Sequence, residues 1–194
     1  MGTPSSHVMQ PKSETWAAAD GTVITIRPIS PADLALEQAF VEGLSASTGY
    51  QRLMSARYPS LEELRRFTNI NHERELALIA TTLVEGSERQ IGVGRYVKEE
   101  SSPSDAEFAI VLSDDWQRRG LGTRLLVSLL VAAKGHGVRR LFGTTMSDNR
   151  GMLELARKLG FRLSTHPGSA TITDLTLDLA GWSPAGVSGV GERA

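Results

Sequence analysis

The residues with the clearest chemical potential form the segment Gln117–Gly122, which reads QRRGLG where a strand pattern gives way to a helix pattern. The first turn of a helix has backbone N–H groups without acceptors inside the helix, and these groups and the helix dipole favour an anion. Gly120 and Gly122 leave the backbone accessible, while Arg118 and Arg119 add positive charge beside it. The segment therefore predicts a phosphate or pyrophosphate site.

Three known phosphate-loop patterns can be tested against this segment. A P-loop requires G-x-x-x-x-G-K-[ST], and no lysine follows either glycine at that spacing. A dinucleotide fingerprint, G-x-G-x-x-G, would need a glycine where Leu125 stands. The pattern Q/R-x-x-G-x-G/A fits at every position. Taken alone, the six residues leave a second interpretation open, a glycine-rich helix start with surface arginines and no ligand.

The elements that must position this loop follow from the hydrophobic periodicity. The chain predicts a strand at Ala106–Leu112 before the loop and a helix at Leu121–Lys134 after it, followed by a strand at Val138–Thr145 and a helix at Asn149–Leu159. The remaining predicted elements are the strands Thr22–Arg27, Glu75–Val84, Gln90–Val97 and Thr171–Leu179 and the helices Pro31–Leu44 and Leu61–Thr68. An antiparallel run followed by two strand–helix units predicts an α/β fold, with a mixed β-sheet flanked by helices on both faces.

The length of 194 residues suits one domain. We expect residues 21–180 to form that domain and residues 1–20 to be a flexible lead-in. The segment 181–194 reads GWSPAGVSGVGERA, and its Gly, Ser and Pro content predicts a flexible tail.

Composition excludes several classes of function. The net charge of −1 gives no reason to expect a nucleic acid or an anionic membrane as a partner. The chain has no cysteine, which excludes disulfides, thiolate metal sites and a cysteine nucleophile. The four histidines show no metal-ligand spacing, so we expect no metal. There is no secretory signal and no apolar run long enough to span a membrane, and we expect a cytoplasmic protein.

Several segments carry a resemblance to a known family. The stretch AEFAIVLSDDWQRRGLGTRLL, the helix from Asn149 and its end RKLGF resemble the GNAT superfamily of N-acetyltransferases, over residues 22–179. The resemblance implies a splayed sheet that holds acyl-CoA between two adjacent parallel strands. The segments STGYQRLMS, LEELRRFTNINHERELALIA and IGVGRYV are similar to the Pat-type bacterial protein lysine acetyltransferases. Those enzymes often carry a large additional domain, for which this chain is too short.

The resemblance also implies which residues contact acetyl-CoA. The strand backbone near Val111 and Leu112 would bind the pantetheine arm, with an N–H near Leu112 stabilising the oxyanion. The backbone of QRRGLG would hold the pyrophosphate, and Asn149 would contact the cofactor arm. The full expected set is Ile110, Val111, Leu112, Gln117, Arg118, Arg119, Gly120, Leu121, Gly122, Thr123, Asn149 and Met152.

Glu107 is the candidate catalytic base. It matches the glutamate of the AEF segment in Pat-like enzymes, and apolar neighbours favour proton uptake by a carboxylate. The alternative is a solvent-facing glutamate on an alternating strand. A second carboxylate, Glu75, follows Arg74 at the start of a strand. It is better explained as part of a surface ion pair than as a catalytic base. Many family members place a tyrosine, the general acid for the leaving thiolate, where this chain has Ala156.

The sequence as a whole predicts an acetyl-CoA-dependent N-acetyltransferase. Because no cysteine exists to form an acyl-enzyme, we expect direct transfer in a ternary complex. The similarity to the Pat-type enzymes implies a lysine ε-amine of a protein as the acceptor, an acyl-CoA synthetase being one candidate. Two alternatives stay open: the same chemistry on a small amine, and a non-catalytic acyl-CoA-binding module. The sequence does not specify the oligomeric state.

Overall fold

The computed structural model describes residues 11–53 and 59–186. Eight strands form one sheet in the order β1-β2-β3-β4-β5-β6-β8-β7. The elements, in chain order, are β1 (Glu14–Ala17), β2 (Val23–Pro28), α1 (Leu34–Glu42), α2 (Ala46–Leu53), α3 (Leu61–Thr68), β3 (Glu75–Val84), β4 (Ser87–Lys98), β5 (Asp105–Leu112), α4 (Leu121–Gly135), β6 (Arg140–Met146), α5 (Arg150–Lys158), β7 (Arg162–His166) and β8 (Ser169–Asp178). Every neighbouring pair is antiparallel except β5 and β6, which run parallel. The predicted mixed α/β sheet is confirmed.

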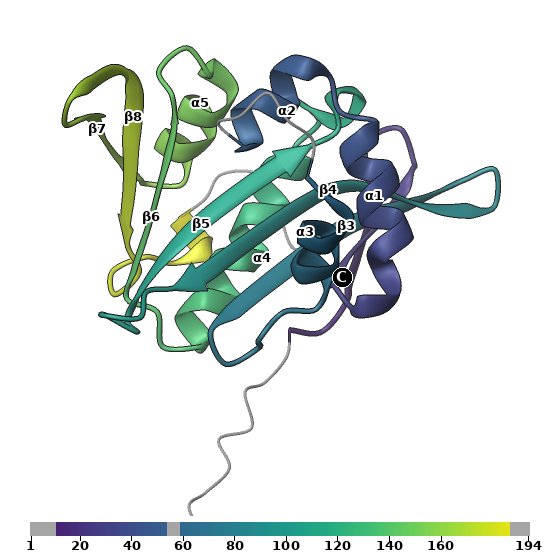
Figure 1. Cartoon of the computed structure of the whole chain (residues 1–194), viewed down its shortest axis with the longest axis horizontal. Coiled ribbons are helices and arrows are strands. Elements are labelled where there is room, and N and C mark those ends of the chain that lie inside the picture. Colours follow the sequence, from purple (N-terminus) through teal and green to yellow (C-terminus); the bar gives the residue numbers. More distant parts are fainter. Residues whose placement is uncertain (1–10, 54–58, 187–194) are drawn as a thin grey trace, which may run out of the picture.

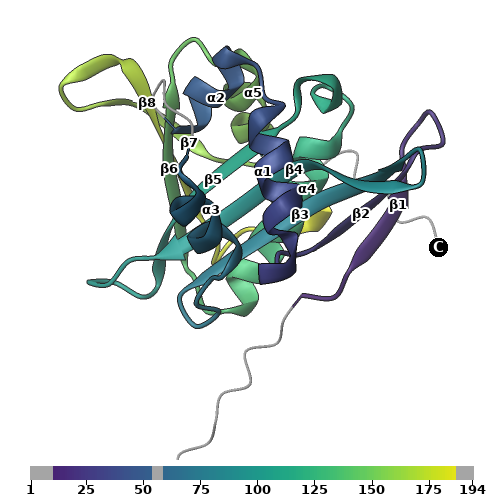
Figure 2. The ribbon, with the colours of Figure 1, turned by 45° about the vertical axis from the view of Figure 1, so that its right-hand side comes forward.

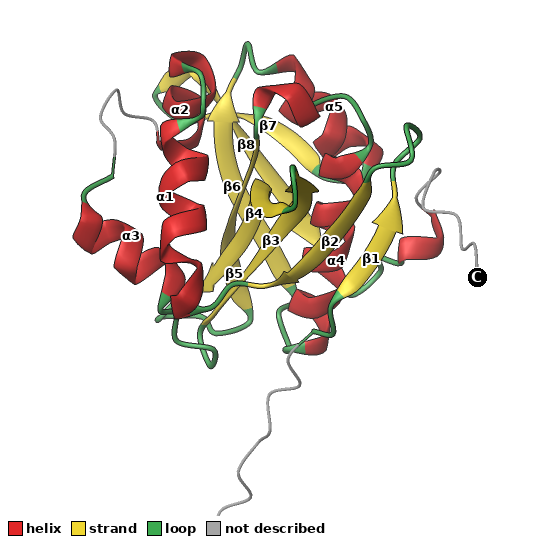
Figure 3. Ribbon diagram, turned by 90° about the vertical axis from the view of Figure 1, so that its right-hand side faces the viewer, coloured by secondary structure: helices red, strands yellow, loops and turns green. Residues whose placement is uncertain are grey.

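Helices cover both faces of the sheet, as predicted (Figure 3). On one face, α4 and α5 enclose a core that includes the fully buried leucines of α4. On the other face, α1 and α3 pack over β3 and β4 through a smaller cluster that includes Phe40, Leu64 and Val93. Strands β3 and β4 therefore divide their side chains between two cores, which is why β3 is apolar almost throughout.

Helix α4 lies close to β4 because two glycines of that strand remove side chains beneath it. A Cβ at Gly94 would lie 3.5 Å from Leu125 Cγ and 3.7 Å from Leu129 Cδ2. At Gly92, a Cβ would come within 2.6 Å of the Leu112 side chain at the end of β5. This close packing sets the first turn of α4 beside the end of β5.

The sheet splits between its two parallel strands. The pairing of β5 with β6 covers three residue pairs only and ends at Glu107 and Phe142 (Figure 1). Beyond that point β5 continues to Leu112 and β6 to Met146 without pairing to each other. The strands are still very close at Gly143, where a Cβ would lie 2.8 Å from the carbonyl oxygen of Phe108. The split predicted from the family resemblance therefore opens directly after this contact.

The two edges of the sheet differ from the sequence expectations (Figure 2). Residues 14–17, inside the expected lead-in, form β1, which docks on α4 because Glu14 accepts hydrogen bonds from Arg124 (2.6 Å) and Ser128 (3.0 Å). The opposite edge is formed by β7, a strand that the sequence analysis did not predict and that pairs with β8. The expected tail also begins later, because Trp182 is buried and its Nε1 donates to the carbonyl oxygen of Leu159 at 3.1 Å. Residues 1–10 and 187–194 of the expected flexible ends lie outside the described residues.

Candidate active site

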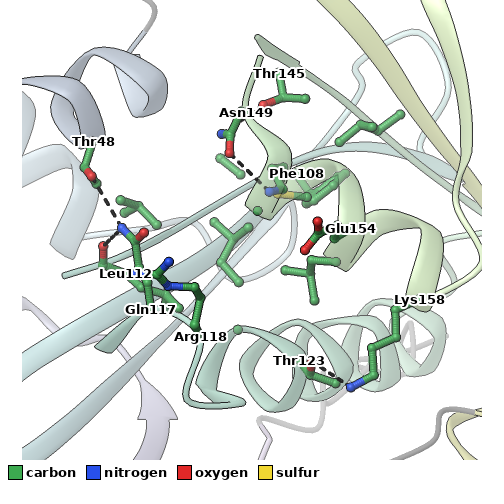
Figure 4. Close-up of a pocket in the computed structure, with 18 of the residues that line it drawn as sticks. Thr48, Phe108, Leu112, Gln117, Arg118, Thr123, Thr145, Asn149, Glu154 and Lys158 are labelled. Carbon is green, nitrogen blue, oxygen red and sulfur yellow. Dashed lines mark hydrogen bonds between the residues drawn. The ribbon is translucent and has the colours of Figure 1, made fainter. Parts of the chain in front are cut away.

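A cavity of about 350 Å³ occupies the split between β5 and β6 (Figure 4). Its size is in the usual range for small-molecule sites. Its walls come from β5, the loop before α4, the first turn of α4, the end of β6 and one side of α5. Ten residues of the expected acetyl-CoA set line it: Ile110, Val111, Leu112, Gln117, Arg118, Gly120, Gly122, Thr123, Asn149 and Met152.

The loop before α4 has the backbone geometry of an anion site. Gly120 is the residue before the helix and has a φ of 83°, and Arg118 has a φ of 59°, a rare value for a residue with a side chain. No side chain caps the N-terminus of α4, and its first turn holds no acidic residue. A Cβ at Gly122 would contact the side chains of Leu112 and Leu155 at 3.4 Å each. The glycines thus keep the N-terminus of α4 open to the cavity, which fits a diphosphate.

Side chains from distant segments hold this loop in place. Gln117 Nε2 lies 3.4 Å from both Thr48 Oγ1 and the carbonyl oxygen of Leu112. The Asp114 carboxylate accepts hydrogen bonds from the Ser45 N–H (3.1 Å), the Ser45 hydroxyl (2.9 Å) and the Thr48 hydroxyl (2.8 Å). Partial burial disfavours the Asp114 charge, but these hydrogen bonds outweigh it and hold the pKa of this carboxyl below its usual range. Through these hydrogen bonds, Asp114 links the start of α2 to the loop before α4.

Replacing Asp114 by Asn should destabilise the fold by about 1 kcal/mol at pH 7, because a charged acceptor is lost on a largely exposed group. Because the pKa of Asp114 is lower in the folded protein, the unfolded chain binds a proton at Asp114 more tightly than the folded protein does. The stabilisation is therefore complete above the unfolded pKa of about 3.9 and is lost as the pH falls through the lower folded pKa.

Urea unfolding of D114N and the parent between pH 7 and pH 2.5 measures this difference, which should shrink below about pH 4. Asp115→Asn, at the exposed neighbouring position, serves as the control and should have little effect. A difference between D114N and the parent that stays constant across that pH range would contradict the assignment.

Asn149 lines the cavity but uses its side chain within the protein. Its Oδ1 accepts the N–H of Met152 at 3.1 Å and so caps α5, while its Nδ2 donates to Thr145 Oγ1 at 3.2 Å. The side chain therefore joins the end of β6 to the start of α5, and any contact with a cofactor arm would come in addition to this structural role.

Two residues of the expected acetyl-CoA set lie outside the cavity lining. Arg119 forms an ion pair with Asp20 at 3.1 Å and lies over the Trp116 ring at 5.2 Å. Leu121 is fully buried in the core beneath α4. The helix periodicity explains the position of Leu121, because only one side of the first turn of α4 can face the cavity. Arg119 lies in the loop before α4, and its side chain interacts with Asp20 and Trp116 instead.

Glu107 is the last residue of β5 that pairs with β6, and its side chain is exposed. It lies on the face of the sheet opposite to Ala106 and Phe108, which are buried under α4. The apolar enclosure expected for it is therefore absent, because alternation along the strand places its sequence neighbours on the other face. Glu107 does not line the cavity, although Phe108 and Ala109, the next two residues, do.

No tyrosine with a described side chain lines the cavity. Ala156, at the position where many relatives have tyrosine, is fully buried. Tyr96 is buried and its hydroxyl lies 2.6 Å from His136 Nδ1 at the C-terminus of α4, and burial raises its pKa. The side chain of Tyr50 and the whole of Tyr58 lie outside the described residues.

The cavity also contains residues that were not predicted. These additional lining residues are Thr48, Phe108, Ala109, Thr144, Thr145, Gly151, Glu154, Leu155, Lys158 and Leu175. Among them, Lys158 belongs to the RKLGF segment that carried the family resemblance, so a signal for it was present in the sequence. Thr48 belongs to the segment STGYQRLMS, which also carried the resemblance, but the periodicity did not predict the helix α2 that holds it. Its position beside the loop is decided by the fold.

The described residues contain no cluster of three or more His, Asp or Glu side chains that could hold a metal ion. None of the described helices is both long enough and apolar enough to cross a membrane.

Comparison with known proteins agrees with this geometry. A family model described as an acetyltransferase (GNAT) domain matches residues 24–162. Acetyltransferase PA5475 from Pseudomonas aeruginosa is 29% identical over 155 residues, which cover 78% of this chain and 82% of that protein. Acetyltransferase Pat from Mycolicibacterium smegmatis is 29% identical over 135 residues, which cover 70% of this chain and 40% of that protein. This chain therefore matches less than half of the length of Pat.

Solved structures show the same fold. The GNAT domain of S. lividans PAT superposes with a TM-score of 0.75 at 22% sequence identity, covering 91% of this chain and 99% of that domain. The family match spans more than half of the chain, from β2 into β7, and includes both strands of the split and the loop before α4. The chain belongs to the GNAT acetyltransferase family, whose members transfer acetyl groups from acetyl-CoA.

Proposed function

We propose that this protein transfers the acetyl group of acetyl-CoA directly to a lysine ε-amine of an acceptor protein. The observation that carries the proposal is the split after Glu107 and Phe142, which leads along β5 to an uncapped helix N-terminus. In this proposal the backbone of β5 from Ile110 to Leu112, left without a partner in β6, binds the pantetheine arm. The amides at the start of α4 hold the diphosphate.

Glu107 is the carboxylate that we propose for the proton transfer. Glu107 is exposed on the face of the sheet opposite to α4, beside the point where the split begins. In the proposed reaction it accepts a proton from the acceptor ammonium, directly or through a water molecule. The amine nitrogen then bonds to the acetyl carbon, and the carbon–sulfur bond breaks as the thiolate leaves. The nitrogen loses its second proton to become the amide, and the thiolate takes up that proton. An N–H near Leu112 stabilises the developing oxyanion.

A protein acceptor is supported by the surface around the split. The exposed residues on β5 and β6 include Glu107, Ala109 and Thr144. Among the described helices, none lies over the middle of these two strands on the α1 side (Figure 1). An open sheet face of this kind admits a lysine that projects from a folded partner. The likeness to Pat, together with the Pat-like segments of the sequence, favours the same class of acceptor. Because the chain spans only 40% of Pat, regulation is not carried over.

The test uses the purified protein, labelled acetyl-CoA, an acyl-CoA synthetase and a panel of small amines that includes polyamines and amino acids. Label on lysines of the synthetase, absent without enzyme, supports the proposal. Label on a small amine alone replaces the proposed acceptor class by small-molecule acetylation. Binding of CoA without transfer to any acceptor contradicts the proposed activity and favours an acyl-CoA-binding module.

A further inference from the structure

Lys158, the last residue of α5, reaches across the cavity wall to α4. Its Nζ lies 3.4 Å from Thr123 Oγ1, in the first turn of α4 (Figure 4). Both residues line the cavity, and the Lys158 side chain is exposed. The ammonium group therefore lies beside the first turn of α4, on the side of α5.

Lys158 and Arg118 are the two cations of the cavity lining. Within residues 11–53 and 59–186, neither has a carboxylate within 4.0 Å, whereas Arg119 and Arg124 are each paired with one. Figure 4 shows Arg118 on the loop side of the first turn of α4 and Lys158 on the α5 side. Two cations without carboxylate partners beside an uncapped helix start create a field that attracts more than one phosphate group.

A carboxylate on α5 restricts where phosphate can lie. Glu154, one helical turn before Lys158, also lines the cavity, and Figure 4 shows it directed into the cavity rather than toward Lys158. A phosphate beside Glu154 would be repelled, because like charges at short range disfavour each other. On α5, the negative charge of Glu154 therefore repels phosphate from the middle of the helix, and the positive charge of Lys158 attracts it to the C-terminal end.

Coenzyme A carries a diphosphate and a separate 3′-phosphate on its ribose. The amides of α4 and the adjacent Arg118 suit the diphosphate, which leaves the Lys158 ammonium for another anionic group. A lysine ammonium is a compact charge on a flexible stem, which suits a single phosphate monoester. We propose that Lys158 binds the 3′-phosphate and makes this enzyme select CoA thioesters over thioesters that lack this phosphate. The inference rests on the proposed function of the cavity.

The test is calorimetric titration of the parent and Lys158→Gln with CoA and with 3′-dephospho-CoA. We expect K158Q to bind CoA about tenfold more weakly and dephospho-CoA with a change below about twofold. The preference of the parent for CoA should fall as salt is raised, because the contact is exposed. In turnover assays K158Q should raise the KM for acetyl-CoA with kcat unchanged.

Arg157→Gln is the matched control, because this substitution removes the same charge from the same turn of α5. Arg157 is exposed and does not line the cavity. R157Q should leave both affinities unchanged, and Lys158→Arg should retain most of the preference for CoA. An equal loss for the two ligands in K158Q would assign Lys158 to the diphosphate and overturn the inference, as would a loss of the same size in R157Q. If the parent binds neither ligand, the proposed function itself fails.

Discussion

Glu107→Gln should lower kcat by about 10²- to 10⁴-fold while the affinity for acetyl-CoA stays at the parent value. The two effects separate because Glu107 lies at the last pair of β5 and β6, outside the cavity lining. The variant removes the proposed proton acceptor and keeps the size of the side chain. Steady-state turnover with saturating acetyl-CoA, together with titration of CoA, measures both quantities.

The fold supplies a close control for this variant. Val97 of β4 pairs with Glu75 of β3 on one side and with Glu107 of β5 on the other. The two glutamates therefore lie in the same row across the sheet. Glu75→Gln therefore removes the same charge from the same row, two strands away from the split, and should leave turnover near the parent rate. If E107Q matched the parent rate across the pH range, or if E75Q lost as much activity as E107Q, Glu107 would not be the base.

Gly143→Ala should destabilise the protein by about 1–3 kcal/mol and weaken CoA binding. The added Cβ would lie 2.8 Å from the Phe108 carbonyl oxygen and 3.1 Å from the Phe108 ring. Neither neighbour moves easily, since the carbonyl belongs to the backbone of β5 and the ring packs against Phe161 at a centroid distance of 5.0 Å. Strand β6 is also fixed on its other side by its pairing with β8. The strain must therefore shift β5 relative to β6 where the split opens.

Urea unfolding and CoA titration of G143A measure the two effects. Gly135→Ala is the control, because it closes α4 with nothing within 4 Å of the added Cβ and without a positive φ. That substitution should be neutral or slightly stabilising. A G143A protein with the stability and CoA affinity of the parent would show that the strands can separate at this point without cost.

The sequence determined those features that depend on neighbouring residues. The strand Glu75–Val84 has its predicted bounds, and the capping box of Ser60 and Glu63 opens α3 as predicted. The start of α4 at Leu121, directly after the glycine loop, is also as expected. Periodicity, capping and turn formation depend on residues a few positions apart, so they can be predicted from the sequence alone.

The tertiary structure decided the contacts between residues far apart in the chain. Asp114 meets Ser45 across 69 positions, and Lys158 meets Thr123 across 35. The weakly patterned edge strand Glu14–Ala17 becomes a strand through pairing with β2 and contacts with α4.

Exposure was likewise decided by tertiary packing. A strand pattern alone does not say which face a helix will cover, and for this reason Glu107 is exposed where an apolar enclosure was expected. The sequence thus contained the glycine loop before α4 and the family of the protein. Which side chains face the cavity depends on how the helices pack on the split sheet, because that packing brings together residues that no local pattern connects.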